Sequence, residues 1–265
     1  MSRFHLPDWE APGLAPDHLP QLSSGEVHLW RADLLELAPL VSLVAGLLAP
    51  EEQERVSRIS QSARREQGLL SQAFVRLVLG MYLRRPPQAI VIERAPGGKP
   101  RLSADDAKGA VTWSLSHAGT LLVLGVGTGS EIGVDLEWRG RAVDAVALSR
   151  RYFAPEEADR IAQTAAQDQV EVFLQYWTAK EAVCKANGRG IAGMLSTTIL
   201  QWSGEQATVV VGQPVGKEPA VYRVRFCDPV AGSLAAMAVE DPAVHLRYWD
   251  GSRAVVEGLL ALSGR

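Results

Sequence analysis

The segment from Gly133 to Trp138, with the sequence GVDLEW, places two carboxylates one strand repeat apart. Alternate side chains of a β-strand share a face, so Asp135 and Glu137 would point to one side and the apolar side chains to the other. A half-buried strand with a solvated acidic face would have the same pattern. However, aspartate is disfavoured in strands, and two carboxylates at this spacing repel each other unless a cation lies between them. The segment is therefore a candidate cation site.

A carboxylate and an ammonium group stand about one helical turn apart further along the chain. Trp177, Glu181 and Lys185 are spaced four apart, so on a helix they form one stripe where core meets solvent. An ion pair within the helix is one explanation, and it contributes on the order of a few tenths of a kcal/mol. The stripe equally suits functional groups. Cys184 lies on the apolar face, where we expect a buried core residue and not a nucleophile.

Two further segments carry groups that suit phosphate oxygens. Lys99 follows two glycines, but a proline then replaces the Ser or Thr of a Walker A loop. Residues 125–129 are glycine-rich, yet an isoleucine takes the third glycine position of a dinucleotide fingerprint, so we expect a turn. Ser116 and His117, at the end of a predicted strand, offer a hydroxyl and a titratable donor. Such a pair also occurs in purely structural roles.

The elements that would position these groups follow the same order twice along the chain. The first series comprises a strand from residue 27, a helix from residue 50, a helix over 69–81, and strands at 90–92, 111–115 and 121–126. The second comprises a strand at 132–138, helices at 143–152, 155–164 and 169–186, and strands at 199–202, 207–211, 221–226, 234–239 and 244–248.

This repeated order predicts an α+β fold, a pseudo-dimer of two similar α+β halves. Each half would be a small, mainly antiparallel sheet packed against a long helix. We expect a Pro-rich N-terminal tail over residues 1–24, an N-terminal half over 25–129, and a C-terminal half over 130–265 that carries the acidic site.

Composition excludes several classes of protein. The 265 residues are 47% hydrophobic, which rules out a disordered chain. With 27 Lys and Arg against 30 Asp and Glu, the net charge is −3, so no basic field suggests nucleic acid or an anionic membrane surface as partner. Two cysteines exclude a disulfide framework, and five dispersed histidines do not suggest a zinc site. No apolar stretch is long enough to span a membrane and no signal peptide is evident, so we expect a cytoplasmic protein.

The two chemical segments, in this order, resemble the signature pair of the phosphopantetheinyl transferase superfamily, approximately G-[IV]-D-x-E and W-x-x-K-E-x-x-x-K. The upstream Gly-Lys-Pro and the Ser-His pair are similar to those of the two-domain, surfactin-synthetase-activating type and not to the short trimeric synthases. Residues 150–156 also match the Arg-Phe-Phe…Glu segment that usually follows the acidic strand. The resemblance runs from about Val27 to Val239.

The resemblance implies transfer of the 4′-phosphopantetheine arm of coenzyme A to a serine hydroxyl of an apo acyl or peptidyl carrier protein. Adenosine 3′,5′-bisphosphate would be the other product. Coenzyme A would lie in the cleft between the halves, and the fused pair implies a monomer. The nucleophile belongs to the partner, so no internal catalytic triad is needed.

The resemblance also implies roles for particular residues. Mg²⁺ would be held by Asp135, Glu137 and Glu181. The catalytic residues would be Glu181 and Lys185, and whether Glu181 acts as base, metal ligand or both stays open. Coenzyme A would be bound by Lys99, Ser116, His117, Arg55, Lys180 and Lys185.

Two departures from the family pattern concern the nucleotide end of coenzyme A. Ser114 stands where related proteins often have asparagine, and Glu52 replaces a lysine of the first helix. Two other classes of function also fit an Asp-x-Glu plus Glu cluster. One is a Mg²⁺-dependent phosphodiester or diphosphate hydrolase with water as nucleophile. The other is a non-catalytic module that binds coenzyme A or a carrier protein.

Overall fold

A computed structural model describes residues 4, 6–15, 18–95, 98–103, 111–188, 195–203, 206–211, 220–240 and 244–263. Gly97, one of the two glycines before Lys99, lies outside these residues, as do Arg189 and Gly190 after the long helix.

The first half of the molecule is built on a four-stranded sheet in the order β11-β1-β5-β4. Its strands are β1 (Glu26–Asp33), β4 (Val111–Ala118), β5 (Leu121–Thr128) and β11 (His245–Asp250). Strands β1 and β11 are parallel and the other pairs are antiparallel. A separate two-stranded ribbon consists of β2 (Ile92–Arg94) and β3 (Pro100–Leu102).

Helical segments cover one face of this sheet. They are α1 (Leu34–Leu37), a 3₁₀ turn (Ala38–Leu40), α2 (Val41–Val44), a 3₁₀ turn (Ala45–Leu47), α3 (Pro50–Ser57), α4 (Ser62–Leu83), a 3₁₀ turn (Pro87–Ala89) and α8 (Arg253–Ser263). Helix α3 begins with a proline, and the Glu52 carboxylate accepts a hydrogen bond from the Ala49 amide at 3.0 Å, which satisfies one exposed donor of the helix start.

The second half is built on an antiparallel five-stranded sheet in the order β6-β10-β9-β8-β7. Its strands are β6 (Ile132–Trp138), β7 (Thr198–Ser203), β8 (Gln206–Val211), β9 (Ala220–Cys227) and β10 (Ser233–Val239). Its helical segments are α5 (Ala145–Tyr152), α6 (Pro155–Gln163), a 3₁₀ turn (Ala166–Asp168) and α7 (Gln169–Asn187).

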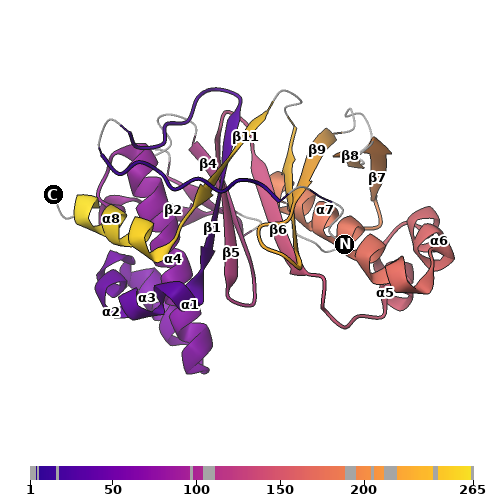
Figure 1. The fold of residues 1–265 in the computed structure, drawn as a ribbon, viewed down its shortest axis with the longest axis horizontal. Coiled ribbons are helices and arrows are strands. Elements are labelled where there is room, and N and C mark those ends of the chain that lie inside the picture. Colours follow the sequence, from indigo (N-terminus) through magenta and orange to yellow (C-terminus); the bar gives the residue numbers. More distant parts are fainter. Residues whose placement is uncertain are drawn as a thin grey trace.

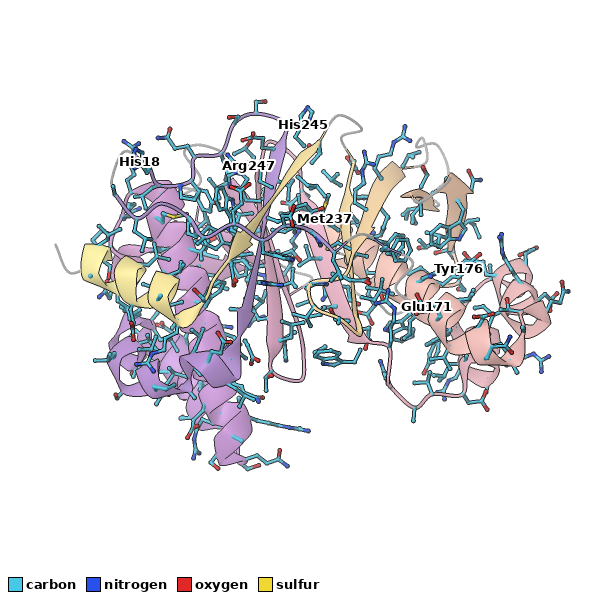
Figure 2. All side chains as sticks on the ribbon, in the orientation of Figure 1. His18, Glu171, Tyr176, Met237, His245 and Arg247 are labelled. Carbon is cyan, nitrogen blue, oxygen red and sulfur yellow. The ribbon has the colours of Figure 1, made fainter. Side chains whose placement is uncertain are left out.

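The two sheets lie between the two helical layers, with α4 and α8 on one side and α7 on the other (Figure 1). Strand alternation produces this arrangement. On β1, Trp30 faces the core around α4, whereas Leu29 faces a core shared with the second sheet. Met237 of β10 belongs to the shared core and lies between the sheets (Figure 2). The halves are therefore joined sheet to sheet.

The predicted α+β class, with each sheet packed against a long helix, is confirmed. The end of the chain differs from the prediction. Residues 245–263 were expected in the second half, but β11 pairs with β1 and α8 packs in the core around α4. Parallel pairing of segments so distant in sequence leaves no local pattern to detect. The division near residue 129 stays a prediction.

The N-terminal segment lies across both halves in the part that is described. Glu10 forms an isolated bridge with Trp249, and the Phe4 ring stacks on Phe226 at 4.8 Å. In the described part of the chain, no helix has both the length and the apolar character needed to cross a lipid bilayer.

A buried histidine belongs to the first half. His28 has no exposed side-chain surface, and its Nδ1 lies 2.6 Å from the Tyr82 hydroxyl, which also accepts a hydrogen bond from the Trp30 indole at 3.0 Å. Burial lowers the pKa of His28 to about 4, against the opposing effect of the Glu26 carboxylate; Arg247 lowers the pKa further.

We expect this histidine to make stability depend on pH. Unfolded histidine has a pKa of about 6.5. Between that value and about 4, the unfolded chain binds a proton that the folded chain does not. The free energy of unfolding therefore decreases as the pH falls, by about 1.4 kcal/mol between pH 7.5 and pH 5.5.

Urea unfolding at these two pH values measures the effect. The decrease in the free energy of unfolding should be smaller in His28→Gln than in the wild type by about this amount. The matched change at His245, exposed on β11, should keep the wild-type loss. Equal losses in both variants would contradict the assignment.

Candidate active site

Strand β6 lies directly on helix α7 because it contains a glycine at the crossing. A Cβ atom on Gly133 would be 1.9 Å from the Ala182 carbonyl oxygen and 2.5 Å from the Ala186 nitrogen, so no other residue fits. The face of β6 that carries Gly133 also carries Asp135 and Glu137. The opposite face, with Ile132, enters the core between the sheets. The alternation predicted for this strand is thus confirmed, but its acidic face meets a helix.

The Asp135 carboxylate is 5% exposed and is shared among groups from both halves. Its Oδ1 accepts hydrogen bonds from the Lys185 ammonium at 2.8 Å and from the Ser116 hydroxyl at 3.0 Å. Its buried Oδ2 has no hydrogen-bond partner among the residues that the structure describes. The Glu137 carboxylate accepts from the Arg141 guanidinium at 2.7 Å. Sequence reasoning missed Arg141, whose only signal was a basic residue soon after the acidic strand.

Burial raises the pKa values of all three carboxyl groups, and the Asp135 charge raises those of Glu181 and Glu137 further. The pKa of Glu181 rises to about 7, first because of burial and then because of the Asp135 charge, while Lys185 opposes the shift. The pKa of Asp135 is raised by burial against Lys185, and that of Glu137 is raised by burial and then by Asp135. The three groups therefore share one electrostatic environment, which a cation would relieve.

Two adjoining cavities meet at these residues. The larger, of about 740 Å³, lies along α3, α4, β4 and the end of α7 and has Arg55 and Lys99 in its wall. The smaller, of about 620 Å³, is lined by the two acids of β6. His117 and Glu181 line both cavities. The stripe predicted on α7 thus reaches the site, with Lys185 in the larger cavity and Trp177 in the smaller.

Strand β4 meets the edge of β6 through alternate side chains. The Thr112 hydroxyl donates to the Ser130 carbonyl at 2.7 Å, and the Ser114 hydroxyl accepts from the Val134 amide at 3.0 Å. Ser116 continues the series and also accepts from Lys185 at 2.9 Å. Ser114, which departs from the family pattern, therefore joins the two sheets, and the Ser116 hydroxyl is already bonded within the protein.

Lys99 crosses from the first half to the second. Its Nζ donates to the Glu131 carboxylate at 2.5 Å, to the Ile132 carbonyl at 2.9 Å and to the Ala186 carbonyl at 3.3 Å. The second departure from the family pattern, Glu52, forms a buried ion pair with Arg76 at 2.6 Å and lines the same cavity. Its charge is therefore balanced inside the protein.

Lys180, which was expected at the site, points away from it. Its fully buried Nζ donates to the Glu157 carboxylate at 2.6 Å, to the Leu195 carbonyl at 2.7 Å and to the Thr198 carbonyl. Lys180 is not among the residues that line either cavity, whereas the next residue, Glu181, lines both. Its expected role in binding coenzyme A is therefore wrong, and Lys180 fixes α7 to α6 instead.

Loss of this buried pair should lower stability without changing ligand binding. Lys180→Met leaves the Glu157 charge buried and unpaired, which should cost about 3 kcal/mol of unfolding free energy. Adding Glu157→Gln removes that charge and should recover part of the loss in urea unfolding. Affinity for coenzyme A, measured by calorimetry on the folded protein, should stay within twofold of wild type. A tenfold weaker affinity for coenzyme A would mean that Lys180 does belong to the binding site.

The acidic residues fit a hard divalent cation, although they form no ready-made cluster. Across the described residues, no three His, Cys, Asp or Glu side chains are grouped closely enough to hold a metal ion. The donor set is nevertheless suitable, because three carboxylates border one cavity and the buried Asp135 Oδ2 lacks a described partner. Lys185 and Arg141 balance the remaining charge. The residues therefore fit a divalent cation by the chemistry of their donor groups.

Comparisons with known proteins agree with this geometry. Residues 30–128 match a family described as 4′-phosphopantetheinyl transferase, N-terminal, and residues 131–231 match the 4′-phosphopantetheinyl transferase superfamily. The 4′-phosphopantetheinyl transferase HetI of Nostoc sp. is 32% identical over 64% of this chain and 72% of its own length. The 4′-phosphopantetheinyl transferase psf-1 of Bacillus pumilus is 28% identical over 75% and 79%. The human L-aminoadipate-semialdehyde dehydrogenase-phosphopantetheinyl transferase is 24% identical over 56% of this chain and 51% of its own. With its acids, basic groups and both family regions in one molecule, this chain belongs to the 4′-phosphopantetheinyl transferase superfamily and is a transferase of that class.

Proposed function

We propose that this protein transfers the 4′-phosphopantetheine arm of coenzyme A to a serine hydroxyl of an apo acyl or peptidyl carrier protein, in a Mg²⁺-dependent reaction. The observation that carries this proposal is the junction of the two cavities at Glu181 and His117. Basic groups border the larger cavity, and the acids that suit a cation border the smaller. A ligand with a nucleotide end and a diphosphate fits this distribution of charge.

Coenzyme A would bind with its nucleotide end in the larger cavity. Lys99 and Arg55 supply cationic groups there, and His117 lies where the cavities meet. Lys185 is 30% exposed and its Nζ donates to Asp135, so it would neutralise charge on the phosphate that is transferred. Ser116 would hold Lys185 in place.

The residues that would hold Mg²⁺ are Asp135, Glu137 and Glu181. When bound, the ion would neutralise negative charge on the diphosphate. The partner's serine oxygen forms a bond to the phosphorus of the arm, and the bond from that phosphorus to the bridging oxygen breaks. Adenosine 3′,5′-bisphosphate leaves with that oxygen. Glu181 is the candidate to accept the serine proton, because without a bound ion burial raises its pKa to about 7, and whether it acts as base, ligand or both stays open.

One chain contains both walls of the cleft, since Lys99 belongs to the first half and the acids to the second. This supports a monomer as the active species. Action in the cytoplasm is part of the same proposal.

Intact mass spectrometry of an apo carrier protein tests the function. The carrier is incubated with coenzyme A, Mg²⁺ and this protein, and the mass gain of a serine-linked phosphopantetheine group is expected. Release of phosphopantetheine without modified carrier would favour the hydrolase. Binding of coenzyme A or carrier with no turnover would favour a binding module.

Lys99 should contribute mainly to binding of coenzyme A. Its ammonium is bonded to the exposed Glu131 carboxylate, which a phosphate of coenzyme A would replace, and loss of such a charge-assisted contact weakens binding by about tenfold or more. We expect Lys99→Ala to raise KM for coenzyme A by about tenfold with kcat changed less than threefold. Arg101→Ala is the control, since Arg101 is an exposed cation on β3, two residues after Lys99. An equal rise in KM for both variants would show only a general loss of positive charge.

A further inference from the structure

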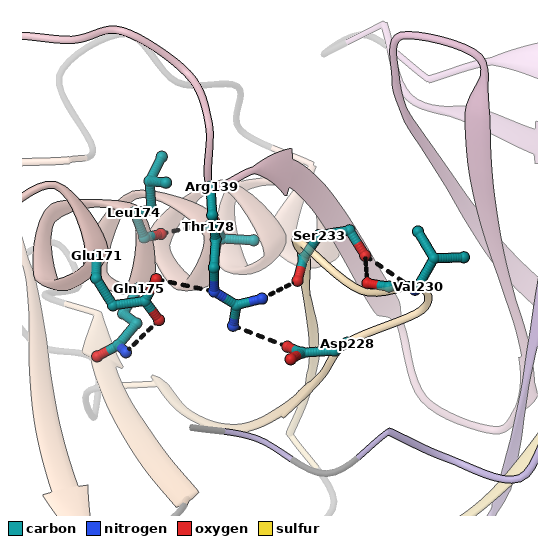
Figure 3. A network of polar contacts seen from close by, with 8 residues as sticks. All are labelled: Arg139, Glu171, Leu174, Gln175, Thr178, Asp228, Val230 and Ser233. Carbon is teal, nitrogen blue, oxygen red and sulfur yellow. Dashed lines mark hydrogen bonds and ion pairs between the residues drawn. The ribbon is translucent and has the colours of Figure 1, made fainter. Parts of the chain in front are cut away.

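A partly buried polar network joins the strand and the helix that carry the candidate active site. Arg139 directly follows β6, and its guanidinium donates to the Glu171 carboxylate at 2.8 Å, to the Asp228 carboxylate at 2.8 Å and to the Ser233 carbonyl (Figure 3). Glu171 is in the first turn of α7. Asp228 and Ser233 flank the turn between β9 and β10. One side chain therefore links three elements of the second half.

The contacts at the two ends of β6 show that the strand runs antiparallel to α7. At its start, Gly133 lies against Ala182 and Ala186. At its end, Arg139 reaches Glu171. The six residue steps from Gly133 to Arg139 span about 20 Å of strand. The thirteen steps of helix from Glu171 to midway between the two alanines span about 20 Å as well. The two anchors are thus matched in length.

The candidate cation ligands lie between these anchors. Asp135 and Glu137 follow Gly133 on the strand, and Glu181 lies between the anchors on the helix. A slip of α7 by one residue would move Glu181 by about 1.5 Å along the strand. Mg²⁺ binds oxygen at about 2.0–2.1 Å with near-octahedral geometry, so such a slip would break the site. The glycine limits how closely the elements approach, and the guanidinium adds a polar link that opposes sliding at the far end.

We propose that Arg139 is a positioning residue, whose ion pairs with Glu171 and Asp228 fix the register of β6 on α7 and so set the carboxylates at the spacing a divalent cation requires. This inference rests on the proposed function, because it assumes that the acids bind a metal. Arg139 is not among the residues that line the two cavities, so it would act through the position of the strand.

Arg31 provides a matched control. It is also a partly buried arginine, and it donates to the Pro229 carbonyl at 2.5 Å in the same turn that Arg139 contacts. Its carboxylate partner is Asp250 of β11, and none of its contacts with described residues reaches α7. Arg31→Met should perturb that turn and lower stability without releasing the helix.

The test is Mn²⁺ binding, measured by electron paramagnetic resonance on the full chain with saturating coenzyme A and no carrier protein. A sample of Mn²⁺ and coenzyme A without protein provides the reference. Arg139→Met should weaken Mn²⁺ binding by about tenfold, as loss of groups that orient metal ligands does. Arg31→Met should stay within twofold of wild type. Glu171→Ala removes the link from Arg139 to the helix, together with a hydrogen bond from Gln175 within α7, and leaves Arg139 with Asp228 and Ser233. It therefore tests the inference if Arg139→Met does not fold. It should weaken Mn²⁺ binding in the same direction by at least threefold.

Wild-type Mn²⁺ affinity in both Arg139→Met and Glu171→Ala would overturn the inference, as would an equal loss in Arg31→Met. The proposed function fails in a different way. If the wild-type chain bound no Mn²⁺ or modified no carrier protein, the metal site itself would be wrong, and the positioning role with it.

Discussion

Replacing Asp135 with asparagine should reduce phosphopantetheine transfer about a thousandfold and leave the fold intact. Asparagine has nearly the same shape, and its amide oxygen can still accept from Lys185 and Ser116. What it removes is the negative charge that would hold the cation. Loss of one charged group that stabilises a transition state typically costs a factor of about 10²–10³. Because Asp135 also balances Lys185, we expect the upper end of this range.

The corresponding change on the helix, Glu181→Gln, should give a similar loss, since it removes both a cation ligand and the candidate base. Initial rates at saturating Mg²⁺ and coenzyme A measure both effects. Asp159→Asn, an exposed aspartate on α6, is the matched control and should keep the wild-type rate. Urea unfolding of each variant shows whether the fold survives. If either site variant kept the wild-type rate, the assignment of the acidic residues would be wrong.

Replacing Gly133 with alanine should destabilise the protein by about 3 kcal/mol, because the new methyl group would overlap the backbone of α7. The Cβ position lies 1.9 Å from the Ala182 carbonyl oxygen, and backbone atoms cannot move aside as a flexible side chain can. The strand and the helix would have to separate. Asp135, two residues further on, would move with the strand, so transfer activity should fall as well.

Thermal unfolding measures this effect. For a chain of this size, a loss of 3 kcal/mol corresponds to a decrease in Tm of about 6–12 °C. Gly46→Ala is the control, since a Cβ atom there meets nothing within 4 Å, and its Tm should change by less than about 2 °C. A Gly133→Ala variant with the Tm of the control would mean that the strand does not lie on the helix as closely as described.

Local patterns were sufficient for most of the elements and for part of the site. The predicted strand at 132–138 and the long helix from 169 agree with β6 and α7. The spacing of four residues predicted that Glu181 and Lys185 share one stripe of the helix. Both line the larger cavity, and Glu181 also lines the smaller. The segments missed include strand β3, the short helices before residue 50 and the terminal α8, and the apolar residues of these helices pack with distant parts of the chain.

The sequence by itself determined which side chains share a face, because strand and helix periodicity depend only on neighbours a few residues away. It therefore predicted that Asp135 and Glu137 point together. Only the tertiary structure decided what each face meets. It turned Lys180 to a buried glutamate on another helix, joined β11 to the first sheet and set Arg139 between the strand and α7. These partners are distant along the chain, and their pairing follows from how whole elements pack, which no short window of residues records.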